Sequence, residues 1–389
     1  MRGEREVRTE PLPIPQPQED AAINPAVQLF AEQARQVNNR FALNETAQPA
    51  VVEICRLLDG LPLAIELAAA WVRILDPATL QTRLAEGAPL LKSGTRDRPE
   101  RHRTLTSTIN WSYQLLSPEA QWAFGRLAVF QGGIPFDGAL AVLQDGERTT
   151  FVEALELIDT LVQANLLQAP TQTPDGPRYL MLQTIQEFGL SVLAPAEQLG
   201  ACRAHAISFA AMASEAEKHY RGPEAGRILA RLDTNSSNLR AAIHWLASPA
   251  SDEPLSALHL SMDLWGDFDA RGRDAEAREA IILALEGAVD APPALRAAAL
   301  AILGHASLEN YEQAETFYRH SIDELAAIPE ADPPFGALFG LASLAQVRSD
   351  YPTAIALTNH LRDLSAAAGD SAAVAIALHQ LGRLETDAG

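Results

Sequence analysis

Two stretches decide the fold: Tyr311-Glu-Gln-Ala-Glu-Thr-Phe-Tyr-Arg-His320 and, 40 positions later, Tyr351-Pro-Thr-Ala-Ile-Ala-Leu-Thr-Asn-His360. They share tyrosine at the first position, alanine at the fourth and histidine at the tenth. The same offset relates a second set of residues, which pairs Ala337, Leu338, Leu341 and Leu344 with Ala377, Leu378, Leu381 and Leu384. A period of this length predicts stacked helix pairs, each of which buries its apolar face only against its neighbours.

The repeat pattern extends toward the N-terminus and ends at the last residue. At an offset of 38, Trp265-Gly266 falls on Leu303-Gly304, which is a weaker copy. We therefore predict that residues 201–389 form helical repeats. The last copy is incomplete, because it stops at Gly389, about where its second helix should begin. We expect the C-terminus to be cut short, since a half repeat leaves a stacking face without a polar cap.

Residues 104–200 have a different pattern, in which short helices precede a β-hairpin. The expected helices are 104–116, 118–129, 137–143 and 150–164, and Ser117 caps the second. Segments 166–169 and 178–182 are typical of strands, and 170–177, with Asp175-Gly176, is the expected turn between them. A helix over 184–193 should follow. This order predicts a winged-helix domain.

Residues 21–92 are predicted to form a small helical domain. Asn24 should cap a first helix that begins at Pro25, a second should end at Gly60, and a third should start at once. The preceding residues 1–20 carry proline at positions 11, 13, 15 and 17, which predicts an extended connector. Residues 93–103 hold four arginines and are predicted to be a linker. The predicted fold class is therefore mostly α.

The charge balance argues against a nucleic-acid-binding surface. The 389 residues include 50 acids and 30 bases, for a formal charge of −20, and no quarter of the chain is net positive. The two cysteines, Cys55 and Cys202, are too few for a disulfide framework or a four-ligand zinc site. We find neither a signal peptide nor a membrane span, so we expect a cytoplasmic protein that contacts no membrane.

Motifs for catalysis are missing. The only lysine-serine pair, Lys92-Ser93, has no glycine just before it and follows a helix, so it is not a phosphate-binding loop. No two histidines have the His-Glu-x-x-His spacing of a zinc site, and there is no Gly-x-Ser-x-Gly sequence. We predict that this chain alone is not an enzyme, hydrolyses no ATP and holds no metal.

The winged-helix segment does not have the charge of a DNA reader. Its candidate recognition helix, over 151–163, contains three acids and no base, and the wing offers only Arg178. Acidic side chains would be repelled by phosphates, so we expect this segment to pack against protein.

Gly60-Leu61-Pro62-Leu63 is the one short motif with a possible ligand. Glycine ends one helix, and proline starts the next with an apolar ring and no N–H. Physical chemistry alone favours a plain helix corner, but such a turn could also lie over a flat base.

Six segments in a fixed order resemble one protein family. They are 26–34, Ile54-Cys-Arg-Leu-Leu-Asp-Gly-Leu-Pro-Leu-Ala-Ile-Glu-Leu-Ala-Ala-Ala70, Arg103-Thr-Leu-Thr-Ser-Thr-Ile-Asn-Trp-Ser-Tyr113, 127–133, Met181-Leu-Gln-Thr-Ile-Gln-Glu-Phe188 and 238–242. Together they resemble the signal-transducing NTPases with numerous domains, the STAND class, and especially the NB-ARC-like bacterial regulators of LuxR or AfsR type.

The resemblance implies a helical lid, a winged helix and tetratricopeptide-like (TPR-like) repeats, preceded by a P-loop domain that is missing here. It implies that Gly60, Leu61, Pro62 and Leu63 lie at a nucleotide, with Pro62 near the base of ADP, only when that domain is present. Leu182 stands where many relatives have a histidine on the β-phosphate, so this sequence departs from the family there. The start of the chain resembles the end of that domain.

We therefore interpret the chain as the regulatory and sensor part of a STAND-type ATPase or transcriptional regulator. In intact relatives ADP or ATP is the cofactor, and exchange of ADP for ATP releases the lid and winged helix for oligomerisation. The implied partners are a nucleotide-binding domain, in the same or a split protein, and a protein or small-molecule inducer on the repeats. Two other hypotheses remain: a stand-alone adaptor whose repeats bind a partner without nucleotide, and a winged-helix DNA-binding regulator.

Overall fold

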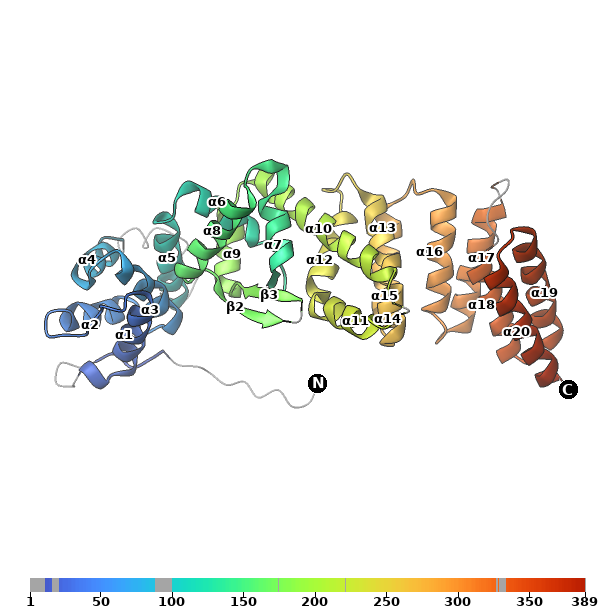
Figure 1. Cartoon of the computed structure of the whole chain (residues 1–389), viewed down its shortest axis with the longest axis horizontal. Helices are drawn as coiled ribbons and strands as arrows, with labels where there is room; N and C mark the ends of the chain where they lie inside the picture. The colour runs from blue at the N-terminus through green and yellow to red at the C-terminus, as the bar shows by residue number, and fades with distance from the viewer. Residues whose placement is uncertain are drawn as a thin grey trace. The chain divides into compact units, whose positions relative to one another are not determined.

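The computed structural model describes residues 11–15, 21–87, 100–173, 175–220, 222–326, 328 and 334–388 (Figure 1). The fold is mostly α-helical, as the sequence predicts, with one small sheet. Residue contacts divide the chain into two compact units, Met1–Ala204 and His205–Gly389. Within the described residues, no helix is long and apolar enough to cross a membrane.

Short helices open the first unit. They are η1 (Ala21–Ile23), α1 (Pro25–Val37), α2 (Gln48–Leu57), α3 (Pro62–Ala69), η2 (Ala70–Arg73) and α4 (Pro77–Gly87). The predicted cap of α1 is confirmed, because Asn24 Oδ1 accepts from the backbone N–H of Ala26 at 3.0 Å. Val27 and Phe30 of α1 are fully buried, and α1 packs on α3.

The next elements are α5 (Glu100–Gln114), α6 (Pro118–Leu127), β1 (Ile134–Pro135), α7 (Phe136–Leu143), η4 (Asp145–Glu147), α8 (Phe151–Gln163), β2 (Gln168–Thr173), β3 (Gly176–Leu180) and α9 (Gln183–Val192). The Ser117 cap is confirmed, since its Oγ accepts from Ala120 N at 3.2 Å. The predicted linker over 93–103 is wrong at its end, because α5 already begins at Glu100. The rest of that linker lies outside the described residues.

The sheet differs from the predicted hairpin in two ways. It has three antiparallel strands in the order β1-β3-β2, and the short β1 pairs Ile134 with Tyr179. A strand of two residues is too short to give a recognisable sequence pattern. The predicted turn over 170–177 is also too long, because β2 and β3 extend into it. Pro170 is accommodated at a register shift between Gln168 and Thr171, where a strand can accept a residue without an N–H.

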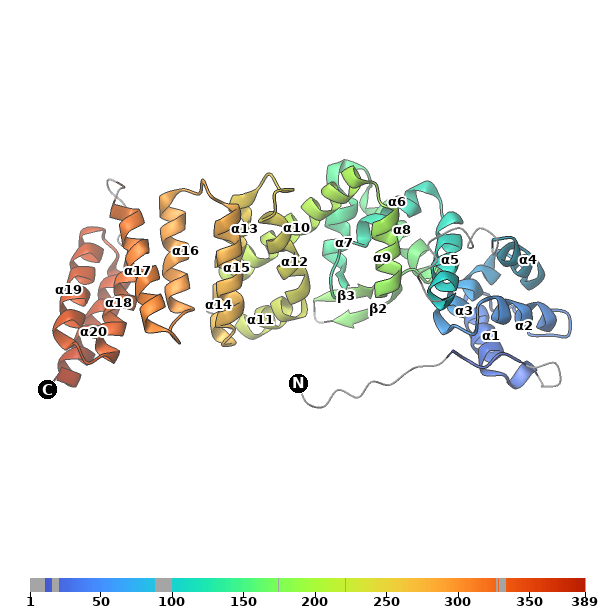
Figure 2. The same cartoon turned by 180° about the vertical axis from the view of Figure 1, so that it is seen from behind.

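Helix α10 (Pro195–Glu217) supplies residues to both units. The second unit continues with α11 (Ala225–Thr234), α12 (Ser236–Leu246), α13 (Pro254–Asp263), α14 (Trp265–Ala270), α15 (Asp274–Gly287), α16 (Pro293–His305), α17 (Tyr311–Ala326), α18 (Phe335–Val347), α19 (Tyr351–Ala367) and α20 (Ser371–Ala388). From α16 to α20, helices that are neighbours in the sequence pack against each other (Figures 1 and 2).

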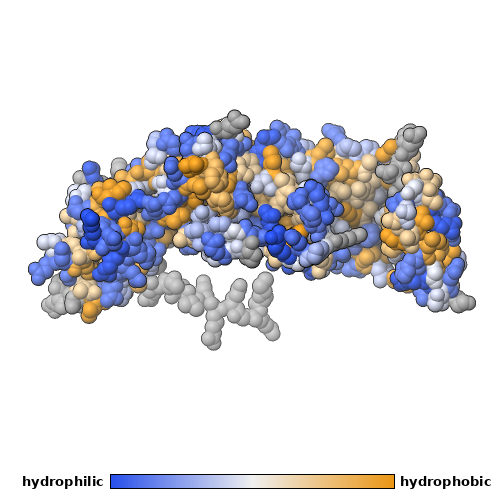
Figure 3. Space-filling view, in the orientation of Figure 1, coloured by the Kyte–Doolittle hydropathy of each residue, from blue (hydrophilic) through white to orange (hydrophobic). Residues whose placement is uncertain are grey.

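The 40-residue period matches the observed elements. Helices α17 and α19 begin at the equivalent positions Tyr311 and Tyr351, and the matched alanines Ala314 and Ala354 are both fully buried. One matched pair of leucines differs in burial. Leu338 is buried against Leu361 and Ala377, whereas its counterpart Leu378 is half exposed. Figure 3 shows hydrophobic surface at this end of the chain.

Candidate functional site

The Gly60–Leu63 turn joins two helices through backbone that favours glycine. The chain leaves α2 with positive φ at two successive residues, 53° at Asp59 and 65° at Gly60. The N–H of Gly60 donates to the carbonyl of Cys55 at 3.1 Å, which closes the end of the helix. Pro62 is then the first residue of α3, where its missing N–H leaves no intrahelical bond unmade. The sequence predicted both features.

Residues 11–15 of the N-terminal proline-rich segment lie against this turn. The N–H of Leu12 donates to the carbonyl of Gly60 at 2.9 Å. A Cβ added at Gly60 would stand 2.2 Å from the carbonyl oxygen of Leu12, so no larger residue fits without movement. Sequence reasoning missed this contact, because proline alternation indicates an extended chain and not what the chain touches.

The four residues of the turn differ in exposure. Gly60 is buried, Leu61 and Leu63 are half-buried, and Pro62 is exposed. Behind them, Ile65 and Leu67 of α3 are fully buried. The ring of Pro62 is therefore exposed to solvent, while the buried residues behind it fix the backbone of the turn.

Two polar contacts hold α3 and the following 3-10 turn to α5 and to the end of α8. The side-chain amide of Asn165, just after α8, donates to the carbonyl of Glu66 at 3.0 Å. The indole N–H of Trp71 donates to Ser112 Oγ of α5 at 3.2 Å, and Trp71 meets Trp111 edge to face. Burial raises the pKa of the Glu66 carboxyl. These contacts join segments about 40 to 100 positions apart in sequence, and periodicity gives no signal for them.

Leu182 occupies the position just before α9. Its backbone is extended, with φ −65° and ψ 144°, and its side chain makes no capping hydrogen bond. It is half-buried. A leucine side chain has neither donor nor acceptor, so it can offer a phosphate nothing but contact.

A wide pocket of about 510 Å³ flanks Leu182. Its wall includes Met181 and Gln183 on either side of Leu182, and Gly132 and Gly133 before β1. None of the residues Gly60–Leu63 lines it. The predicted site residues are thus placed on two separate features, the turn before α3 and the start of α9, and no described pocket joins them.

Arg178, the single basic residue of the predicted wing, is already hydrogen-bonded. Arg178 of β3 donates through Nη2 to the carbonyl of Gly132 at 2.9 Å, and burial lowers the pKa of its guanidinium. Helix α8 carries Glu153 in a capping box with Thr150. Phe151 and Val152, on the same first turn, are exposed apolar side chains. Among the described residues, no group of three or more potential metal ligands is present.

Comparison with known proteins finds relatives for part of the chain. No protein-family model matches. Proteins named "Putative HTH-type transcriptional regulator" in Mycobacterium bovis and Mycobacterium tuberculosis are 34% identical over 220 residues, which are 57% of this chain and 25% of theirs. Proteins from the same organisms named "Uncharacterized protein" are 37% identical over 202 residues, which are 49% of this chain and 48% of theirs. The matches thus span between a quarter and about half of these relatives.

Comparison with solved structures also finds similar chains. One of them is a signal transduction ATPase with numerous domains that has a tetratricopeptide repeat sensor, from Pyrococcus horikoshii. The alignment covers 93% of this chain and 57% of that one, with 14% sequence identity and a TM-score of 0.32. A TM-score of this size does not establish a common fold.

Proposed function

We propose that this chain is the regulatory and sensor portion of a STAND-type signal-transduction ATPase or of a related transcriptional regulator. It packs against a nucleotide-binding domain, in the same or a split protein, and binds an inducer on its repeats. The name of the relatives that are 34% identical supports a regulatory role. The matched segment is a quarter of their length, so the activity of the whole protein is part of the proposal.

The observation that carries this proposal is the turn before α3. Pro62 is exposed at a helix start, while Gly60 behind it is buried and hydrogen-bonded to Leu12. Pro25 and Pro118 also open helices with exposed rings. What distinguishes Pro62 is therefore the buried, hydrogen-bonded Gly60 two residues before it. An exposed ring on a backbone fixed in this way suits contact with a flat partner such as a nucleotide base.

The residues fit one part of ADP and not the other. The proline ring offers an apolar face, which matches the chemistry of a base. Leu182 has no polar side-chain atom with which to hold a β-phosphate, so the phosphates would have to be bound by the nucleotide-binding domain of the proposal. When bound, the nucleotide would supply a charge-dependent link between domains, and Pro62 would contact its base.

The test measures nucleotide chemistry on the chain alone and with a P-loop domain fused before Met1. Alone, the chain should hydrolyse no ATP and bind ADP at most weakly in calorimetry. In the fusion, Pro62→Ala should weaken ADP binding several-fold. Pro77→Ala is the matched control, because Pro77 also opens a helix of the same unit. Micromolar ADP binding by the chain alone would contradict the proposal, as would equal effects of the two variants.

The absence of a polar atom on Leu182 favours one alternative, a stand-alone adaptor whose repeats bind a partner without nucleotide. The genomic reading frame upstream of Met1 separates the two. A P-loop coding stretch there, in frame or frameshifted, supports the regulatory portion of an ATPase. Unrelated sequence supports the adaptor.

A further inference from the structure

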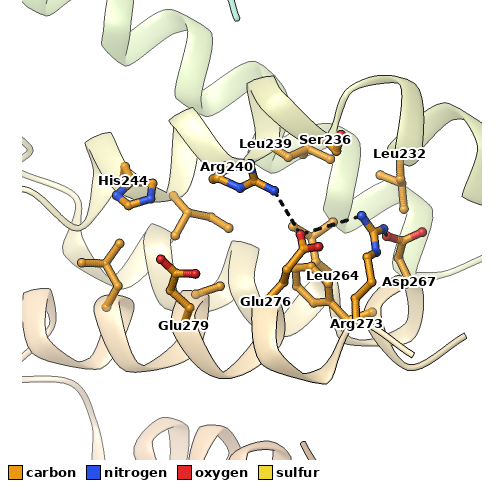
Figure 4. A pocket seen from close by; sticks show the side chains of 14 residues that line it. Leu232, Ser236, Leu239, Arg240, His244, Leu264, Asp267, Arg273, Glu276 and Glu279 are labelled. Atoms are coloured by element: carbon orange, nitrogen blue, oxygen red, sulfur yellow. Dashed lines mark hydrogen bonds and ion pairs between the residues drawn. The ribbon is translucent and has the colours of Figure 1, made fainter. Parts of the chain in front are cut away.

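A cavity of about 90 Å³ lies inside the second unit, between α12 and α15 (Figure 4). Its lining comes from α11, α12, α14 and α15 and from the residues just before α14 and α15, and it is half apolar and half polar. The apolar lining consists of Leu232, Leu239, Ile243, Leu264, Phe268, Ala280 and Leu283. A space of this size holds a short aliphatic chain and is too small for a folded partner element.

Ion pairs close one end of this cavity. Arg240 of α12 reaches across to Glu276 of α15, with 3.1 Å between Nη2 and Oε2. Glu276 also lies 3.9 Å from Arg273, and Arg273 is hydrogen-bonded to the buried carboxylate of Asp267. Figure 4 shows Glu276 between the two guanidinium groups. Both arginines of the lining are therefore paired with carboxylates of the protein, although the buried Nε of Arg273 has no hydrogen-bond partner among the described residues.

The carboxylate of Glu279 lies at the other end of the cavity (Figure 4). Glu279 lies one turn after Glu276 on α15, on the same side of the cavity, and His244 of α12 stands opposite (Figure 4). Glu279 is exposed, and within the described part of the chain it makes no hydrogen bond or ion pair. An anion in this cavity would be repelled by Glu279, and at the two guanidinium groups it would have to compete with Glu276 and Asp267. A cation would meet a free partner.

The net charge of the whole second unit also favours a cationic ligand. From His205 to Gly389 the sequence has 13 lysine and arginine residues and 26 acidic residues, a formal charge of −13. Such a field attracts cationic ligands and raises their local concentration.

We propose that the cavity between α12 and α15 binds an aliphatic chain that ends in a positive charge, with the chain against Leu239, Ile243 and Phe268 and the charge at Glu279. A lysine or arginine side chain of a partner protein has this chemistry, and so does a free alkylamine. The inference rests on the proposed role of the repeats as the ligand-binding part of the protein, and it adds the chemistry of the ligand.

The first experiment titrates the full chain with three six-carbon probes: hexylamine, hexanol and hexanoate. Binding is followed by calorimetry and by the shift in unfolding temperature. Hexylamine should bind about five-fold more tightly than hexanol, because an exposed ion pair contributes at most about 1 kcal/mol. Hexanoate should bind more weakly than hexanol. An equal affinity for all three, or a preference for hexanoate, would overturn the proposal.

Two variants locate the site. Glu279→Gln should reduce hexylamine binding to the level of hexanol and leave hexanol unchanged. Glu286→Gln, on an exposed residue of the same helix outside the lining, is the control and should change neither. Ala280→Leu fills the cavity and should abolish binding of both probes, provided that circular dichroism shows a folded chain. Hexylamine binding that survives both Glu279→Gln and Ala280→Leu would show that the site lies elsewhere.

A third arm distinguishes the source of the cation. An acetylated, amidated tripeptide with a central lysine is compared with hexylamine and with the same peptide carrying norleucine. Tighter binding of the lysine peptide than of hexylamine assigns the cavity to a partner protein, and tighter binding of hexylamine assigns it to a free amine. No nucleotide enters these measurements. Their failure therefore leaves the proposed docking to a nucleotide-binding domain intact, and failure of that docking leaves their result valid.

Discussion

Gly60 is constrained twice, by its backbone angle and by its surroundings. Its φ of 65° lies in the left-handed region, and its missing side chain makes room for Leu12. The sequence indicates the first constraint, because glycine between two helices is a common helix end. It gives no sign of the second. The contact matters for the candidate site because it fixes the turn that presents Pro62.

Replacing Gly60 by alanine should separate the two effects. Gly60→Ala should lower the free energy of unfolding by about 2–4 kcal/mol, since it adds a clash with Leu12 to the cost of the backbone angle. Gly146→Ala is the control: its φ is 73°, but a Cβ there would meet nothing within 4 Å, so it should cost only about 1 kcal/mol. Urea denaturation measures both. Equal losses would show that the Leu12 contact is unimportant for stability.

His205 is a buried histidine that should make stability depend on pH. Its Nε2 lies 3.1 Å from Asn238 Oδ1, and burial lowers its pKa to about 4. The unfolded chain, with a pKa near 6.5, binds the proton more readily, so this contribution is complete above pH 6.5 and declines as the pH falls toward 4. Between pH 7 and pH 5 the loss should be about 2 kcal/mol.

The measurement compares urea denaturation at pH 7 and pH 5 for the natural chain and for His205→Gln. The variant should lose less stability between the two pH values, because glutamine does not titrate. His219→Gln, which removes an exposed histidine next to Glu215, should behave as the natural chain does. A pH dependence that is the same in all three proteins would refute the assignment to His205.

At the scale of helices, small residues decide how closely the repeats pack. Tyr318 of α17 is fully buried, its hydroxyl has no hydrogen-bond partner among the residues that the structure describes, and its ring meets His305 edge to face. A Cβ at Gly304 or Gly340 would lie 2.3 Å or 2.2 Å from that ring. These glycines let α16 and α18 approach α17. A sequence shows glycine in a helix but not which neighbour requires it.

Glycine-to-alanine substitutions in two repeat helices should therefore have opposite signs. Alanine favours a helix by roughly 1 kcal/mol over glycine, so Gly382→Ala in α20, with open space around it, should raise the unfolding temperature. Gly340→Ala in α18 should lower it, because the new methyl group collides with Tyr318 at a cost of about 1–3 kcal/mol. Calorimetry of both variants decides. Stabilisation by Gly340→Ala would mean that the packing around Tyr318 is looser than described.

At the scale of the whole chain, the two units differ in net charge and in the polar contacts that stabilise them. The formal charge of −20 lies mostly in the second unit, where it suits the binding of cations. The first unit holds its helices together with polar contacts such as Trp71 to Ser112. We propose that this unit docks to a nucleotide-binding domain through the turn at Pro62 and that the second unit senses a ligand.

The sequence by itself determined the helical class, the caps at Asn24 and Ser117, and the positions at which equivalent repeat helices begin. These features depend on residues within one or two turns of each other, so they can be read from local spacing. Only the tertiary structure decided the pairing of β1 with β3, the contact of Leu12 with Gly60 and the cavity that Glu279 lines. Each of these joins residues far apart in the chain, and their meeting depends on how the intervening helices pack.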